Sequence, residues 1–174
     1  MFEIRAAGAL LAAVFSALMG FALGNDLKRR AALLRELYKG VVMMHQEVDY
    51  LKVPLEEAMQ HAGTILTEPL SSFFQETGSR LERLPGTPFF SVWEESAGLW
   101  LKDSGLMQED RELLLQLGRQ LASPETLERG GFLTVYERRL EELIQKAEKE
   151  YQNKAQLYGR LGVLGGIFLV IVLI

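Results

Sequence analysis

Residues 27–51 have the sequence LKRRAALLRELYKGVVMMHQEVDYL, and a set of their apolar positions recurs at steps of three, four or seven. These positions are Leu27, Leu34, Leu37, Val41, Met44, Val48 and Leu51. Because an α-helix completes a turn in about 3.6 residues, such steps place the side chains on one face. The stretch therefore predicts a long amphipathic helix whose apolar stripe must be covered by other parts of the chain.

Four of the five prolines stand where further helices are expected to begin. Proline suits the first turn of a helix, since the N–H that it lacks would have no partner there. The four are Pro54, Pro69, Pro88 and Pro124, whereas Pro85-Gly86 marks a turn. Helices are expected over roughly 55–62, 69–77, 88–101 and 108–121, followed by a long helix from 124 to about 160.

The predicted fold class is all-α, a helical bundle over residues 26–157, because no segment alternates apolar and polar residues as a strand would. Trp93 and Trp100 lie seven residues apart on one helix face, and we expect both in the core. Gly118 costs about 1 kcal/mol relative to alanine inside a helix. A close helix crossing would explain this glycine, and so would simple tolerance.

The last helix carries an apolar repeat of seven residues at Leu133, Leu140 and Ala147. We expect this stripe to pack inside the chain's own bundle, and a coiled-coil seam to a partner is the alternative. Gly130-Gly131 is expected to kink this helix or to split it.

The N-terminal end is expected to be a membrane anchor, residues 1–25. Ala6–Gly24 is a run of nineteen residues without a charge, which as a helix would span about 28 Å, close to the thickness of a bilayer core. A cleaved signal peptide is the alternative, since Ala22-Leu23-Gly24 resembles a cleavage site. The excess of three positive charges between residues 26 and 39 favours an uncleaved anchor whose following domain stays in the cytoplasm.

The C-terminal end, residues 158–174, is expected to be a second hydrophobic membrane segment. Leu161–Ile174 holds fourteen apolar residues, and their helical length of about 21 Å is short for a full span. A helix packed into the core of the central domain is the alternative. Small residues recur every four positions in both apolar ends, a spacing that lets membrane helices pack closely on each other or on neighbouring subunits. The alternative is that glycine and alanine are simply common in membrane helices.

Composition and motifs give no support for catalysis. The chain has no cysteine, two histidines and a net charge of −4, which excludes disulfides and thiol chemistry and argues against nucleic-acid binding. No phosphate-binding, zinc-protease or serine-hydrolase motif occurs. We expect no catalytic, cofactor-binding or metal-binding residue and no small-molecule substrate, with His45 and His61 as half-buried helix histidines.

The negative charge gathers in the middle of the chain. Residues 40–123 hold thirteen acidic and six basic residues, a net charge of −7. An acidic face of this kind suits a protein partner with basic residues, and a solvated surface that aids solubility is the alternative. We expect the docking face to include the carboxylates of Glu56, Glu57, Glu94 and Glu95.

Three stretches, in order along nearly the whole chain, resemble the stage III sporulation protein AB family of endospore-forming bacteria. The first runs from Arg30-x-x-x-Leu34-Arg35-x-Leu37 through Glu47-Val48 to Pro54-Leu55-x-x-Ala58. The second is Trp93-Glu94-Glu95-Ser96 with Leu114-x-x-Leu117-Gly118-x-x-Leu121. The third is Lys154-x-x-x-Tyr158-x-x-Leu161-Gly162-Val163-Leu164-x-Gly166.

The resemblance implies a helical cytoplasmic domain like that of the inner-membrane platform proteins of type II secretion and type IV pilus systems. It implies a non-catalytic platform in the mother-cell membrane facing the forespore, within the channel complex that joins the two cells. The expected partners are the other proteins of that complex and a cytoplasmic secretion-type ATPase.

The alternative is a membrane-tethered enzyme or regulator whose site forms only by tertiary convergence. A pocket lined by His45 or His61 together with carboxylates would favour that alternative. A solid core of leucine, tryptophan and phenylalanine would favour the platform.

Overall fold

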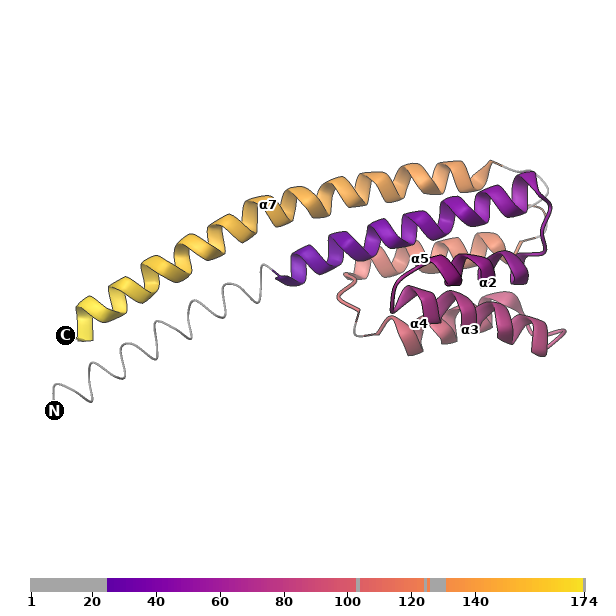
Figure 1. Cartoon of the computed structure of the whole chain (residues 1–174), viewed down its shortest axis with the longest axis horizontal. Coiled ribbons are helices and arrows are strands. Elements are labelled where there is room, and N and C mark those ends of the chain that lie inside the picture. Colours follow the sequence, from indigo (N-terminus) through magenta and orange to yellow (C-terminus); the bar gives the residue numbers. More distant parts are fainter. Residues whose placement is uncertain (1–24, 103, 124, 126–130, 174) are drawn as a thin grey trace. The chain divides into compact units, whose positions relative to one another are not determined.

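The computed structural model describes residues 25–102, 104–123, 125 and 131–173, and throughout this part of the chain the regular structure is helical (Figure 1). Two compact units can be separated, one of residues 32–144 and one that includes residues 25–31 and 145–173. The all-α prediction is confirmed for the described residues. The expected anchor over residues 1–25 lies outside them, apart from its last residue.

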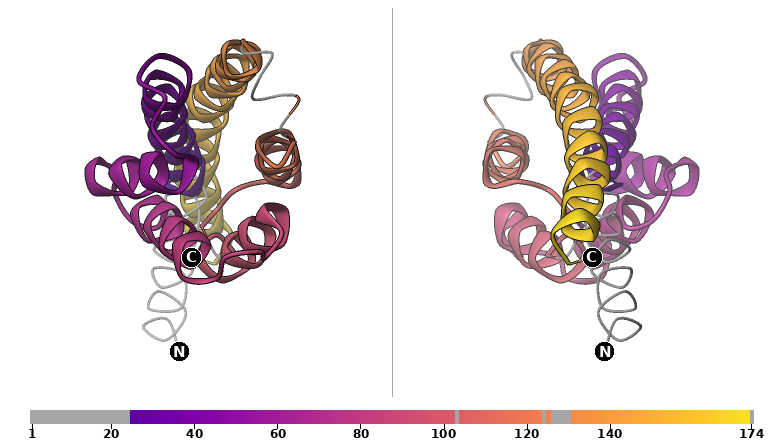
Figure 2. Two further views of the ribbon diagram at one scale, coloured as in Figure 1. Left: turned by 90° about the vertical axis from the view of Figure 1, so that its right-hand side faces the viewer. Right: turned by 90° about the vertical axis from the view of Figure 1, so that its left-hand side faces the viewer.

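A helix over residues 25–45 passes directly into a π-helical turn. The other helices follow in order. The elements are η1 (Gln46–Tyr50), α2 (Leu55–Ile65), α3 (Leu70–Arg83), α4 (Phe89–Trp100), α5 (Gln108–Leu121) and α7 (Phe132–Leu173). Residues 32–45 run antiparallel to the first part of α7, while α2, α3, α4 and α5 follow one another in an arc (Figure 2).

Proline marks three of the helix starts as predicted: Pro54, Pro69 and Pro88 directly precede α2, α3 and α4. The start of α5 uses a carboxylate instead, because Asp110 accepts a hydrogen bond from the Met107 N–H at 2.9 Å. The expected start of the last helix at residue 124 lies outside the described residues, and Glu125 is helical. The predicted split at Gly130-Gly131 is confirmed at Gly131, whose positive φ of 71° is incompatible with a right-handed helix, and α7 begins at Phe132 directly after it.

The apolar stripe of the first helix is buried as predicted over its central part, at Leu34, Leu37, Val41 and Met44. It does not continue to its expected end, since Leu51 is 69% exposed. The cause is the π-helical turn, in which the Leu51 N–H bonds to the carbonyl of Gln46 five residues earlier. A turn that holds an additional residue rotates the following side chains away from the stripe.

Trp93 of α4 is fully buried in an aromatic cluster. Its ring meets Phe73 edge to face at a centroid distance of 4.8 Å and stacks on Phe89 at 5.8 Å. Its indole N–H donates to the carbonyl of Leu114 on α5 at 3.1 Å. The prediction for Trp100 is wrong: this residue ends α4 and is 43% exposed, while Leu101, directly after it, is buried instead.

Gly118 lies against the flat side of the Trp93 ring. A β-carbon at this position would fall 2.3 Å from Cδ1 of Trp93, far inside van der Waals contact. The close-crossing explanation for this glycine is therefore confirmed. Glycines also allow α2 and α3 to pack closely. A β-carbon on Gly78 would fall 2.6 Å from the Glu56 carbonyl oxygen, and one on Gly63 would fall 2.9 Å from the backbone nitrogen of Gln75.

The apolar repeat of the last helix packs inside the chain's own bundle, as predicted. Leu133, Tyr136, Leu140 and Leu143 are all buried in the single chain. No coiled-coil partner is needed to cover this stripe.

In the unit that includes residues 25–31 and 145–173, Arg30 is almost fully buried and its Nη1 lies 2.9 Å from Oε2 of Glu150. Arg30 is one of the basic residues counted in the positive flank, so part of that positive charge is paired within the protein. α7 extends to Leu173 and thus includes most of the expected C-terminal segment. Among the described residues, no helix is both long enough and apolar enough to cross a bilayer.

Candidate functional site

The four glutamates expected to form one acidic face lie on two helices that are separated by α3. Glu95 on α4 pairs with Arg80 of α3 at 2.6 Å, and Glu57 on α2 lies 3.8 Å from Nε2 of His61. Within the described part of the chain, Glu56 and Glu94 have no ion-pair partner. These two side chains are therefore the carboxylates of the set that remain available to a partner.

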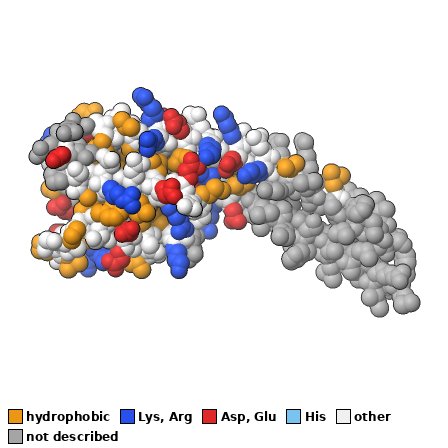
Figure 3. All heavy atoms as spheres, turned by 180° about the vertical axis from the view of Figure 1, so that it is seen from behind, with side chains coloured by type: hydrophobic (Ala, Val, Ile, Leu, Met, Phe, Trp, Pro, Cys, Tyr) orange, Lys and Arg blue, Asp and Glu red, His pale blue; other side chains and the backbone are white. Residues whose placement is uncertain are grey.

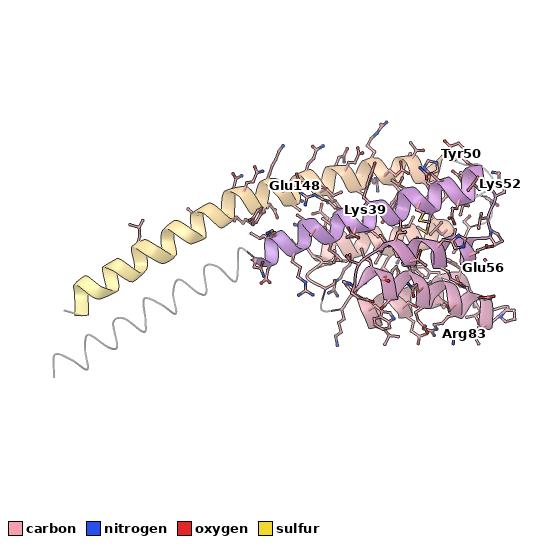
Figure 4. All side chains as sticks on the ribbon, in the orientation of Figure 1. Lys39, Tyr50, Lys52, Glu56, Arg83 and Glu148 are labelled. Atoms are coloured by element: carbon pink, nitrogen blue, oxygen red, sulfur yellow. The ribbon has the colours of Figure 1, made fainter. Side chains whose placement is uncertain are left out.

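Basic side chains of α3 interrupt the acidic surface. Arg80 lies between the two glutamate-bearing helices, and Arg83 ends α3 at the same end of the α2–α3 pair as Glu56 (Figure 4). Counting charges over residues 40–123 could not show this interruption, since Arg80 reaches Glu95 only through the packing of α3 on α4. Arg83 pairs instead with Glu76 of its own helix at 3.5 Å.

The two histidines lie on either side of the π-helical turn, each between carboxylates. Nδ1 of His45 is 2.6 Å from Oε1 of Glu137 on α7, and its Nε2 is 3.4 Å from Oδ2 of Asp49. Nδ1 of His61 is 3.0 Å from Oε2 of Glu47. The π-helical turn thus directs Asp49 toward His45 and Glu47 toward α2, which fastens the turn from two sides.

This histidine–carboxylate arrangement joins helices at their surfaces. His45 is half-buried as predicted, whereas His61 is more exposed than predicted, with 46% of its side chain accessible. Across the residues that the structure describes, no group of His, Cys, Asp and Glu side chains could hold a metal ion.

A pocket of about 220 Å³ lies between α5 and the start of α7, and neither histidine lines it. Its lining residues are Gln116, Gln120, Phe132, Val135, Tyr136 and Arg139. Seen from behind, this side of the molecule shows hydrophobic side chains among charged ones (Figure 3). We call this feature the α5–α7 groove.

Two hydrogen bonds set the geometry of the groove. The Tyr136 hydroxyl donates to the Leu113 carbonyl of α5 at 2.7 Å, and Nη1 of Arg139 donates to Oε1 of Gln116 at 3.1 Å. Sequence reasoning missed this groove. A detectable signal was present, since Gln116 and Gln120 are four residues apart on one helix face, as are Val135 and Arg139.

Burial raises the pKa of Tyr136 well above its usual range, although the charge of Arg139 acts in the opposite direction. The pKa of Tyr136 is higher in the folded state than in the unfolded state, where it is about 10. The stability that its protonated hydroxyl contributes is therefore complete below pH 10 and is lost progressively as the pH rises above 10. We expect Tyr136→Phe to cost about 1 kcal/mol at pH 8 through the lost hydrogen bond. Above pH 10 this cost should shrink by up to about 1.4 kcal/mol per pH unit.

Urea unfolding of both proteins at pH 8, 10 and 11 measures this difference. Tyr50→Phe is the matched control, since Tyr50 is 75% exposed. A difference between the wild type and Tyr136→Phe that stays constant over this range would contradict the assignment.

The family model described as stage III sporulation protein AB matches residues 5–174, which is nearly the whole chain. The chain belongs to the stage III sporulation protein AB family. A relative from Bacillus subtilis (strain 168), named stage III sporulation protein AB, is 22% identical over 170 residues, 98% of this chain and 99% of the relative. No solved structure matches the chain.

Membership of the stage III sporulation protein AB family supports a role in sporulation. The contact between Trp93 and Gly118 also involves residues that carry the resemblance to this family. Trp93 and Gly118 belong to the second stretch that carries the likeness to the family, and the fold brings them into direct contact. That part of the resemblance therefore corresponds to helix packing.

Proposed function

We propose that this chain is a non-catalytic platform of the channel complex between mother cell and forespore, and that it links a cytoplasmic secretion-type ATPase to the membrane channel. The observation that carries the proposal is the solid aromatic and leucine core around Trp93. A site formed by tertiary convergence would instead place His45 or His61 with carboxylates in a pocket. Both histidines lie at helix–helix contacts.

The proposal includes attachment to the mother-cell membrane through residues 1–25 and 158–174. The support is the charge-free run Ala6–Gly24 and the apolar sequence Leu161–Ile174, with the domain between them in the cytoplasm. α7 continues from the bundle into the second of these segments as one helix, Phe132–Leu173. The membrane segments would then hold the platform beside the channel proteins.

The proposed contact with the ATPase uses the carboxylates of Glu56 and Glu94, which have no ion-pair partner among the described residues. A basic surface on the ATPase would meet them without breaking any ion pair of the platform. Glu57 and Glu95 contribute less to this contact, since His61 and Arg80 already lie beside them.

We expect Glu56→Lys with Glu94→Lys to weaken association with the ATPase by about tenfold, because two attractions at the edge of the contact become repulsions. The measurement is the yield of ATPase recovered with the full-length protein from solubilised membranes. Glu142→Lys is the control, because Glu142 is an exposed residue of α7 outside this surface. Unchanged recovery with the double variant would rule out this docking surface.

A further inference from the structure

We propose that the α5–α7 groove is a second docking site, which binds a short acidic segment of a partner protein through an apolar side chain and a neighbouring carboxylate. This inference uses residues that the ATPase contact does not use. It stands or falls independently of the proposed platform function.

The apolar part of the groove is formed by α7. Phe132 and Val135 line it, and Val135 is 62% exposed although it stands beside the buried Tyr136. The volume of about 220 Å³ lies below the range of about 300–1,000 Å³ that is usual for small-molecule pockets. Its size therefore suits one or two side chains of a peptide.

The polar part of the groove has hydrogen-bond donors that no acceptor among the described residues uses. Arg139 bonds to the neutral side chain of Gln116, and no carboxylate pairs with it in the described part of the chain. Among the same residues, nothing bonds to the side-chain amide of Gln120, which is exposed. A guanidinium held by one neutral bond still has donors for the two oxygens of a carboxylate.

This combination favours a peptide over a membrane surface as the occupant. A lipid surface attracts clusters of several lysines and arginines, whereas one arginine lines this groove. The two glutamine amides can both donate to and accept from a peptide backbone. An apolar residue with Asp or Glu within one helical turn would fill the apolar part and pair with Arg139.

Photocrosslinking in sporulating cells tests the site with the full chain. The probe is p-benzoylphenylalanine in place of Val135, and the crosslinked peptide is identified by mass spectrometry. The same photoreactive residue in place of Leu99, an exposed side chain of α4, is the matched control. Arg139→Glu in the Val135 background tests the charge, and circular dichroism verifies that this surface variant is folded.

The expected adduct is a peptide of another protein with Asp or Glu within four residues of the crosslinked position. Its yield should fall about tenfold with Arg139→Glu and recover when the partner's acidic residue is changed to arginine. It should be absent from the Leu99 control. An adduct with lipid or with a second copy, a yield that Arg139→Glu does not change, or no adduct at all would overturn the proposal.

Discussion

Trp93→Ala is expected to lower the free energy of unfolding by about 3–5 kcal/mol. The indole fills the centre of the aromatic cluster between α3, α4 and α5. Its removal opens a cavity, leaves Phe89 without its ring partner, and leaves Phe73 with only Phe74. For a chain of this length, the loss corresponds to a fall in Tm of about 2–4 °C for each kcal/mol. Denaturant unfolding followed by circular dichroism measures the change.

Trp100→Ala is the matched control for this substitution. The same side chain is removed from the same helix, but Trp100 is partly exposed at the end of α4. Its loss should cost less than about 1 kcal/mol. Equal costs for the two variants would contradict the placement of Trp93 at the centre of the core.

Gly118→Ala is expected to destabilise the protein by about 1–3 kcal/mol, even though alanine is the better helix former. The added β-carbon would fall 2.3 Å from Cδ1 of Trp93, whose ring is fully buried. The overpacking therefore outweighs a gain of about 1 kcal/mol in helix propensity. Thermal unfolding should show a lower Tm.

Gly98→Ala provides a control of opposite sign. Gly98 also lies within a helix, but a β-carbon there would meet no atom within 4 Å. We expect this variant to gain about 0.5–1 kcal/mol. In a Trp93→Phe background the cost of Gly118→Ala should shrink, because a smaller ring relieves the contact. A stabilised Gly118→Ala protein would rule out the close crossing.

The sequence predicted the helices well because helical periodicity and proline are local signals. The buried stripe from Leu34 to Met44 and the starts of α2, α3 and α4 follow from such signals. The end of the stripe could not be predicted, since the π-helical turn that exposes Leu51 depends on contacts of His45 with α7 and of Glu47 with α2. The spacing of apolar residues along the chain does not reveal those contacts.

The sequence-based predictions at the core boundary and at the charged surfaces are incomplete for the same reason, because these features depend on packing between distant segments. Periodicity assigns Trp93 and Trp100 to one face, yet at the end of α4 the buried side chain is that of Leu101 and not that of Trp100. Charge counting likewise identified an acidic segment without showing that Arg80 neutralises Glu95. The α5–α7 groove joins Gln116 to Arg139 across 23 residues, so only the packing of two distant helices creates it.

The most direct test of the platform function is a crosslinked pull-down of the full-length protein from detergent-solubilised membranes of sporulating cells, with partners identified by mass spectrometry. The platform function predicts recovery of a secretion-type ATPase together with ring-forming channel proteins. It also predicts that Glu56→Lys with Glu94→Lys lowers the recovery of the ATPase while the channel proteins are retained. Recovery of neither class, with the protein alone as a membrane monomer, would contradict the platform function.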